Sequence, residues 1–219
     1  MKKTYLVPAF LLALASLFPA DYHYAETVDG KERESTASLV RDEESGQQVL
    51  DWQDPSSGDA HTIRLDSRFE TMEWTCRSAN GDSFTATREG DALLIEWARG
   101  GKYGKEEREI DGDPWYASLD FGLTGFMRSG KEEAEFWSFT PQDFKTRKMT
   151  AERTGDDSFA YGEESVRATG VRVTASGVPS IFFKMKYLMR SSDGIRLLFE
   201  GKQGGPGSAK IVSRLVREE

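Results

Sequence analysis

The sequence predicts a mainly β protein, in which a curled antiparallel sheet (a half-barrel or a barrel) holds one amphipathic helix packed in its concave face. Three observations predict this class. Polar turn sequences recur at short intervals with Thr, Val, Trp and Phe between them, as in antiparallel sheets. Many segments between the turns are polar on one face, which suits a sheet with one face in water. Residues 113–140 form an aromatic-rich stretch with a helical pattern at its start.

The N-terminus has the pattern of a secretory signal. Two lysines precede an apolar run at residues 5–18, and Ala20 offers a small residue for cleavage. We therefore expect residues 1–20 to be a signal peptide and residues 21–219 to form a single exported antiparallel β domain, periplasmic or extracellular. The apolar run is short for a bilayer span and no second run of that length occurs, so the mature form is not expected to span a membrane. An uncleaved anchor is the alternative.

Charge limits the classes of partner. The net charge is −8 for the whole chain and falls to −10 when the signal and its two lysines are removed. Nucleic-acid-binding proteins neutralise phosphates with basic patches, and this chain has none, so no nucleic acid is expected as a partner. The same argument excludes simple electrostatic docking on anionic lipid.

The first half of the domain, residues 21–109, reads as a succession of short strands. The clearest hairpin signal is Asn80-Gly81, which joins strands predicted at 72–77 and 83–88. Strands and helices do not alternate along the chain, so a doubly wound fold is not expected.

The central helix is predicted at about residues 114–128. Asp113 suits the N-cap and Pro114 the first helical position, where a missing N–H costs nothing. Gly130 offers a stop. Apolar residues follow Pro114 at helical spacing and would form one stripe: Trp115, Leu119, Leu123 and Phe126.

Strand-like sequence continues after the helix. Loops are predicted at 156–162 and 201–207 because these ranges are polar or rich in glycine. Alternation places Ile195, Leu197 and Phe199 on one face of their strand. The predicted strands lie at residues 132–140, 146–153, 165–169, 171–175, 181–189, 195–200 and 209–216.

The candidate binding site is the aromatic face around the helix. It consists of Trp115, Phe126, Trp137 and Tyr187, which could line a pocket for an apolar ligand. The other interpretation is a helix that simply covers a sheet. Burying one large apolar side chain stabilises a fold by about 1.5–3 kcal/mol whether or not a ligand binds, so the residue types alone leave both interpretations open.

Motifs for catalysis and metal binding are missing. The two histidines, His23 and His61, have no partners at metal-ligand spacing, and no phosphate-binding glycine loop or nucleophile elbow occurs. Cys76 is the only cysteine, so no internal disulfide can form, and a buried, inert thiol is expected. We predict no enzyme activity, no catalytic residue, no metal site and no cofactor.

A set of aromatic and turn residues resembles a known group of proteins. The residues are Trp115-Tyr116 with Leu119, Phe136-Trp137 with Pro141, the strand around Tyr187, Asp193-Gly194, and Gly205-Pro206-Gly207. They resemble uncharacterised secreted bacterial proteins that are similar to a larger β-rich family of unknown function. That family in turn is similar to the periplasmic lipoprotein-carrier superfamily. The resemblance implies a half-barrel around helical segments with an apolar concavity, and it implies no catalytic residue.

Three functions follow as hypotheses. The first is an exported, non-enzymatic domain that binds a hydrophobic or amphipathic ligand, such as a lipid or an apolar small molecule, or an envelope protein. The second is a carboxylate-dependent hydrolase of envelope glycans, which requires two facing acids with at least one shielded from water. The third is a purely structural protein-binding module that offers a sheet edge to its partner.

Overall fold

The structure is a computed structural model that describes residues 20–42, 45–177, 184–202 and 209–219. These residues form one antiparallel sheet and the helix α1 (Leu119–Ser129). The strands are β1 (Ala20–Val28), β2 (Lys31–Arg41), β3 (Gln48–Gln53), β4 (Ala60–Leu65), β5 (Thr71–Arg77), β6 (Ser83–Glu89), β7 (Ala92–Arg99), β8 (Lys102–Glu109), β9 (Glu133–Thr140), β10 (Lys145–Tyr161), β11 (Glu164–Ala175), β12 (Lys184–Arg190), β13 (Arg196–Lys202) and β14 (Lys210–Glu218).

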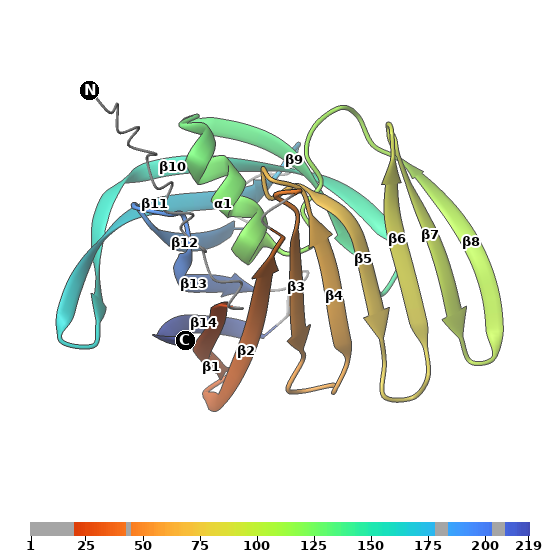
Figure 1. The fold of residues 1–219 in the computed structure, drawn as a ribbon, viewed down its shortest axis with the longest axis horizontal. Helices are drawn as coiled ribbons and strands as arrows, with labels where there is room; N and C mark the ends of the chain where they lie inside the picture. The colour runs from red at the N-terminus through yellow and green to blue at the C-terminus, as the bar shows by residue number, and fades with distance from the viewer. Residues whose placement is uncertain (1–19, 43–44, 178–183, 203–208) are drawn as a thin grey trace, which may run out of the picture.

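Fourteen strands lie in the single sheet, in the order β8-β7-β6-β5-β4-β3-β2-β1-β14-β13-β12-β11-β10-β9. Every neighbouring pair follows the chain except β1 and β14, which pair from Tyr22 opposite Glu218 to Val28 opposite Ile211. The sheet therefore has an N-terminal half, β1–β8, and a C-terminal half, β9–β14, joined where the two ends of the chain meet. Figure 1 shows the sheet curling, with β9–β13 passing behind β2–β5. The predicted curled antiparallel sheet with one helix is confirmed.

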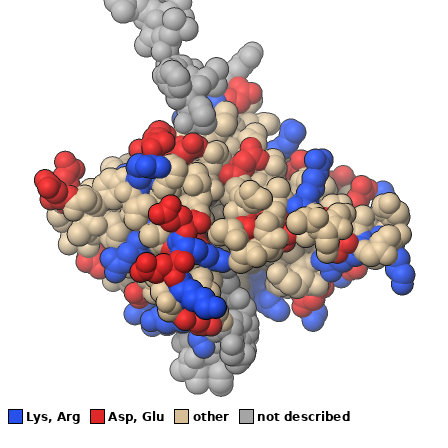
Figure 2. Space-filling model, turned by 90° about the horizontal axis from the view of Figure 1, so that it is seen from below, with Lys and Arg blue, Asp and Glu red and all other residues tan. Residues whose placement is uncertain are grey.

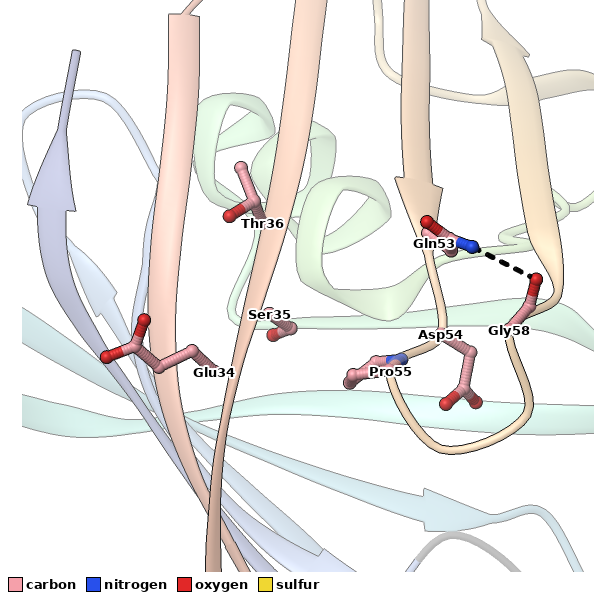
Figure 3. Close-up of a pocket in the computed structure, with 7 residues that line it drawn as sticks. All are labelled: Glu34, Ser35, Thr36, Gln53, Asp54, Pro55 and Gly58. Carbon is pink, nitrogen blue, oxygen red and sulfur yellow. Dashed lines mark hydrogen bonds between the residues drawn. The ribbon is translucent and has the colours of Figure 1, made fainter.

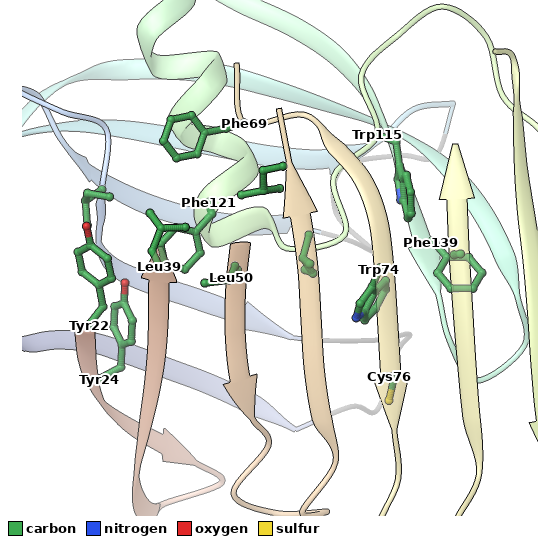
Figure 4. Packing of buried hydrophobic residues seen from close by; sticks show 14 of the residues in the cluster. Tyr22, Tyr24, Leu39, Leu50, Phe69, Trp74, Cys76, Trp115, Phe121 and Phe139 are labelled. Atoms are coloured by element: carbon green, nitrogen blue, oxygen red, sulfur yellow. The ribbon is translucent and has the colours of Figure 1, made fainter. Parts of the chain in front are cut away.

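The two ends of the curled sheet pack on each other. Phe139 of β9 lies edge-on to Trp74 of β5 and to Phe84 of β6, with ring centroids 5.7 Å apart in each pair. Phe144, just before β10, stacks on Trp97 of β7. These rings belong to a buried apolar cluster that extends to β1 and β2, and Figure 4 shows part of it. The inner face of the sheet is thus its core.

Residues 114–117, predicted as the first turn of the helix, are extended instead. The Trp137 N–H donates to the Pro114 carbonyl and the Tyr116 N–H donates to the Trp137 carbonyl, so this segment pairs with β9. On its other side the Thr71 N–H donates to the Trp115 carbonyl, and the Ala117 N–H donates to the Thr71 hydroxyl. Bonds from β9 and β5 hold the backbone extended, and this tertiary context overrides the local helix signals.

The helix α1 begins five residues later than predicted. Ser118 is the N-cap and makes no side-chain capping bond, so Asp113 and Pro114 have no part in the helix start. The C-terminal end is as predicted, because Gly130 adopts the left-handed conformation (φ 70°) that favours glycine at this position. One turn of the predicted stripe, the turn that carries Trp115, is therefore outside the helix.

The helix lies inside the curl and contacts both halves of the sheet. Gly125 packs directly against the Arg68 carbonyl in the β4–β5 turn, so closely that a Cβ at this position would overlap the oxygen. On the opposite side the Thr124 hydroxyl donates to the buried Gly194 carbonyl, in the β12–β13 turn, at 2.8 Å. Phe121, Leu123 and Phe126 are buried, which confirms a helix packed in the concave face.

One of the two predicted loops is strand, and most of the other lies outside the described residues. Residues 156–161 are strand, because β10 pairs with β11 as far as Tyr161 opposite Glu164. The two acids at positions 156 and 157 are exposed strand residues, and Phe159 is buried. Most of the predicted 201–207 loop, the start of the predicted 181–189 strand, and nearly all of the predicted signal peptide fall outside the described residues.

Candidate functional site

The four predicted site residues lie in two different parts of the core. Trp115 is fully buried in the cluster that joins β5, β6 and β9, and Trp137 packs against this cluster while partly exposed. Phe126 and Tyr187 are buried in a second cluster, which lines the C-terminal half. The structure therefore divides the four residues between two clusters, two in each.

Each pair has its own contacts. The Trp137 indole N–H donates to the Asp111 carboxylate at 2.8 Å, whereas the Trp115 indole N–H is buried with no acceptor among the described residues. Tyr187 packs on Phe199 with ring centroids 5.0 Å apart. In the described part of the chain, these rings are covered mainly by neighbouring side chains.

Polar side chains also converge inside the curl. We call Tyr24, Glu26, Asp120 and Arg196 the inner polar cluster. The Arg196 Nη1 lies 2.8 Å from the Asp120 carboxylate on α1, and its guanidinium lies 3.8 Å from the centroid of the Tyr24 ring. Arg196 is 4 % exposed and Tyr24 is 2 % exposed, so a cation and its aromatic partner are buried beside the half-buried Asp120 carboxylate.

Glu26 extends this cluster toward β2. Its carboxylate accepts from the Arg33 Nε at 2.7 Å, from the Ser35 hydroxyl at 3.0 Å, and from the Ser213 hydroxyl of β14 at 3.4 Å. Since β1 pairs with both β2 and β14, these side chains belong to three adjacent strands of the inner face. They form a polar strip beside the two apolar clusters.

Burial determines the protonation of the cluster. It raises the pKa of the Tyr24 phenol far above its usual range, and the Arg196 cation offsets only part of this effect. Burial likewise raises the pKa of the Asp120 carboxyl, against the lowering effect of Arg196. The Tyr24 hydroxyl and the Arg196 Nε have no hydrogen-bond partner among the described residues. A buried donor without a partner costs free energy, so both groups favour a polar atom bound beside them.

A second polar group lies on the inner face of the N-terminal half. One donor atom from each of Asp59, His61 and Cys76 lies within 4.8 Å of the other two. His61 on β4 is directly opposite Cys76 on β5, and Asp59 precedes His61 by two residues. The Trp52 ring stacks on the imidazole with centroids 4.3 Å apart and an interplanar angle of 9°.

The electrostatics of this group follow from burial. Burial raises the pKa of the Cys76 thiol to about 11, with a further contribution from the Asp59 carboxylate. Burial lowers the pKa of His61, so the ring is neutral at pH 7. The Trp74 indole N–H donates to His61 Nδ1 at 3.2 Å, and the Ser78 hydroxyl donates to Asp59 at 2.6 Å. The thiol is therefore protonated beside a neutral imidazole, and Cys76 is buried as predicted.

One pocket among the described residues lies at the β3–β4 turn (Figure 3). It is lined by polar and small residues, and the Gln53 amide donates to the Gly58 carbonyl across it. The Asp54 carboxylate already accepts from the Ser56 N–H and hydroxyl, which form the turn itself. Its polar groups thus stabilise the turn.

Comparisons with known proteins show the fold. No protein-family model and no curated protein sequence matches this chain. Among solved structures, the β-barrel-like protein of the domain of unknown function DUF1849 from Brucella abortus matches with a TM-score of 0.57 and 9 % identity, over 93 % of this chain and 98 % of that chain. The hypothetical lipoprotein YmcC from Escherichia coli matches with a TM-score of 0.38 and 10 % identity, over 92 % of this chain and 89 % of that chain.

The chain has a β-barrel-like fold. This confirms the predicted likeness to uncharacterised β-rich proteins of unknown function. At 9 % identity the likeness extends to the fold and not to the site. Among the described residues, no helix has the length and hydropathy needed to cross a bilayer. On the face drawn in Figure 2, acidic and basic side chains are intermixed.

Sequence reasoning missed both polar groups for the same reason. Strict alternation places Arg196 on the opposite face from Ile195 and Leu197, but the register shifts between Leu188 and Met189 of β12. The shift puts Arg196 opposite the inward-facing Met189 and leaves Leu197 as the extra residue of a bulge. A bulge of this kind has no marker in the sequence of β13.

The group around His61 depends on register as well. His61 and Cys76 are fifteen positions apart in sequence, and only the pairing of β4 with β5 makes them neighbours. The aspartate two residues before the histidine was the one signal in the sequence. It could not identify the cysteine as the third member of the group.

Proposed function

We propose that this protein is an exported envelope domain that binds an amphipathic molecule through the inner face of its curled sheet. The observation that carries the proposal is the inner polar cluster, where a cation and a phenol with unused donors lie beside apolar walls. Binding sites for small molecules are mostly apolar with a few convergent polar groups. The signal-like N-terminus supports export.

The polar end of the ligand would bind at Arg196 and Tyr24. Arg196 already pairs with Asp120, so the cluster offers hydrogen-bond donors more than net positive charge. A neutral or singly charged head group with acceptor oxygens therefore fits better than a phosphate dianion. The Tyr24 hydroxyl would donate one bond and the Arg196 Nε another, which would satisfy the two buried donors.

The apolar part of the ligand would lie along the second cluster. Phe126 and Tyr187 of the predicted aromatic face belong to it, and Phe199 and Ile211 continue it toward β14. Such a ligand, a lipid or an apolar small molecule, would replace contacts between the protein's own side chains. Trp115 and Trp137 lie in the other cluster and would act by holding the sheet closed.

The hydrolase alternative receives partial support. Asp120 is a carboxyl whose pKa burial raises, and the Glu26 carboxylate is close enough to raise it further. Glu26 is bonded to Arg33, however, and Asp120 is paired with Arg196. Both acids are thus held by cations, which favours a binding role over general acid and base catalysis. We propose no enzyme activity.

The structural-module alternative needs an unpaired edge strand with few charges. One edge of the sheet is β8, in which six of eight residues are charged (sequence KYGKEERE). Charged edge strands disfavour pairing with another strand. The other edge, β9, is partly covered by residues 114–116. Both edges therefore disfavour the addition of a strand from a partner, and an envelope protein would have to bind elsewhere on the domain.

Native mass spectrometry of the protein purified from an exporting host tests the proposal. We expect adducts of lipid mass that organic extraction removes, and binding of the amphipathic dye 1-anilinonaphthalene-8-sulfonate to the extracted protein. Arg196→Gln should weaken dye binding by about 10-fold, the loss of one or two hydrogen bonds to a charged group. Arg214→Gln, on the exposed face of β14, should not change it.

Circular dichroism establishes that both variants are folded. The absence of adducts together with no dye binding by the folded wild type would overturn the proposal. Equal dye affinity in the Arg196 variant and the wild type would remove the inner polar cluster as the site.

A further inference from the structure

We propose that Asp59, His61 and Cys76 form a binding site for a divalent transition-metal ion, with zinc as the best match. This site lies on the inner face of the N-terminal half and does not involve the inner polar cluster. The three side chains supply one oxygen, one nitrogen and one sulfur donor within 4.8 Å of one another. Zinc binds this mixture of carboxylate, imidazole and thiolate, whereas calcium and magnesium take oxygen ligands.

The backbone holds the donors in place. His61 and Cys76 are direct cross-strand partners, so their side chains leave the same face of the sheet. The Asp59 carbonyl accepts from the Asp54 N–H, which fixes the end of the β3–β4 turn where β4 begins. A metal would therefore bind to a nearly formed site on a stiff scaffold.

Outer contacts resemble those of a ligand set. The Ser78 hydroxyl donates to Asp59 at 2.6 Å and orients the carboxylate. The Trp52 ring covers one face of the His61 imidazole. Partners of this kind hold metal ligands in position and tune the affinity of the site. Asp59 and His61 are partly exposed, so an ion can reach the donors.

The distances require a small movement. A tetrahedral ion with bonds of about 2.0–2.3 Å separates its ligand atoms by about 3.3–3.8 Å. The three donors are within 4.8 Å, so side-chain rotations that bring them about 1 Å closer are sufficient. Three protein ligands leave a fourth position for water or another molecule, the arrangement found in zinc sites that are open to substrate.

One existing hydrogen bond must break. His61 Nδ1 now accepts from the Trp74 indole N–H, so the neutral ring carries its proton on Nε2. The bond is lost whichever ring nitrogen binds the metal, because a metal on Nδ1 takes the lone pair and a metal on Nε2 moves the ring proton to Nδ1. Metal binding would release the Trp74 indole and change the ring on which Trp52 stacks, so the tryptophan fluorescence of the chain should change.

Binding also releases a proton. The Cys76 thiol must lose its proton to bind the metal, and the ion would balance the negative charge left on the sulfur. Asp54 and Arg99 are the other charged groups that act on this site, the first on His61 and the second on Cys76. The negative charge of Asp54 and the positive charge of Arg99 offset each other. The net charge of the site therefore depends on the three proposed ligands.

Zinc titration of the purified wild type, followed by calorimetry and by tryptophan fluorescence, tests the proposal. We expect one ion per chain, a change in tryptophan fluorescence, and weaker binding at lower pH. Cobalt(II) as a substitute should give a thiolate-to-metal absorption band. Cys76→Ser should abolish this band, and His61→Gln should weaken zinc binding by more than the 10- to about 100-fold that loss of an outer partner costs.

The matched control is His23→Gln, because His23 is the only other histidine and lies on β1. This variant should bind zinc as the wild type does. If wild type and Cys76→Ser bind zinc equally, or if cobalt(II) gives no thiolate band in the folded wild type, the proposal is wrong. Protection of the Cys76 thiol from a thiol reagent by zinc, lost in the folded His61→Gln variant, would support it independently.

Discussion

At the scale of single residues, contacts with other segments of the chain determine which side chains the inner face of the sheet can accommodate. Gly125 lies against the Arg68 carbonyl, and Arg196 is buried beside Asp120 and Tyr24. Neither position can be recognised from its neighbours in sequence. The environment of each position is instead set by another segment of the chain. Each position therefore gives a testable prediction.

Replacing Gly125 by alanine should destabilise the protein, although alanine favours a helix by about 1 kcal/mol over glycine. The new methyl group would overlap a backbone oxygen of the β4–β5 turn, so the helix must move outward. We expect the free energy of unfolding in urea to fall by about 1–3 kcal/mol. Gly112→Ala is the control, because a Cβ there meets open space. Stabilisation by Gly125→Ala would contradict the observed packing.

Removing Arg196 should make stability depend more strongly on pH. Burial raises the pKa of Asp120 in the folded protein, and Arg196 limits the rise. A carboxyl with a raised folded pKa binds more protons folded than unfolded, so stability falls as pH rises above the unfolded value of about 4. Arg196→Met should therefore lose more stability at pH 7 than at pH 4, measured by urea unfolding.

The double variant Arg196→Met with Asp120→Asn is the control for this experiment. Compared with Asp120→Asn alone, the double variant should show a smaller difference between pH 7 and pH 4, and what is left is due to Glu26, the other acid that acts on Arg196. An equal loss at both pH values in the single variant would mean that Asp120 is not the carboxyl that Arg196 supports.

At the scale of elements, tertiary bonds and not local signals set the limits of the helix. The Asp113-Pro114 pair reads as a helix start, yet Pro114 begins an extended segment that joins β9 to β5. The N-cap at Ser118 makes no side-chain bond. The helix is positioned instead by Thr124, which bonds to the β12–β13 turn.

Removing the N-cap residue of the helix should therefore destabilise the protein less than removing the Thr124 hydroxyl. Ser118→Ala removes an N-cap residue but no bond, so it should cost less than the about 1 kcal/mol typical of such a change. Thr124→Val keeps the shape but leaves the buried Gly194 carbonyl without its donor, and should cost about 1–3 kcal/mol. Urea unfolding of the two variants compares them directly. A larger loss in Ser118→Ala would show that the cap positions the helix.

At the scale of the whole molecule, the curled sheet is closed by side chains as well as strands. Arg99, at the end of β7, donates to the Pro141 and Gln142 carbonyls in the β9–β10 turn, and its guanidinium lies 4.3 Å from the Phe144 ring centroid. The Arg108 Nε of β8 donates to the Phe144 carbonyl. These contacts link strands that are eleven or more places apart in the sheet order.

Breaking this link should loosen one part of the molecule. Arg99→Met should lower the free energy of unfolding by about 1–2 kcal/mol and speed hydrogen exchange in β8 and in the β9–β10 turn. Hydrogen exchange in β1 and β14, at the centre of the sheet, should accelerate only by the amount that corresponds to the loss in the free energy of global unfolding. Arg77→Met, on an exposed position of β5, serves as the control. Uniform acceleration in all strands would mean that closure does not depend on Arg99.

Much of the fold could be predicted because its signals are local. Turn residues and alternating patterns determine where a strand begins and which face is apolar, and those patterns are read within about ten residues. The hairpin at Asn80-Gly81 joins β5 to β6 as predicted, and Gly130 ends the helix. The loop prediction at 156–161 was wrong, because exposed acidic residues on a strand have the same sequence pattern as a loop when the partner strand is unknown.

The site could be predicted only in part. Trp115, Phe126, Trp137 and Tyr187 were chosen by residue type as a binding face, and the role of this face in binding stays a prediction. The inner polar cluster depends on a bulge in β13, and the group of Asp59, His61 and Cys76 depends on the register of β4 with β5. Both are relations between segments, so no property of either segment alone shows them.

The sequence by itself determined the class of this protein, a curled antiparallel sheet with one inner helix, because hydrophobic periodicity and turn chemistry act within a few residues. Only the tertiary structure decided where the helix begins, which charges enter the core, and which donors meet across strands. Those features depend on backbone partners contributed by segments far apart in the chain, and a partner's position is not encoded at the residue that it stabilises.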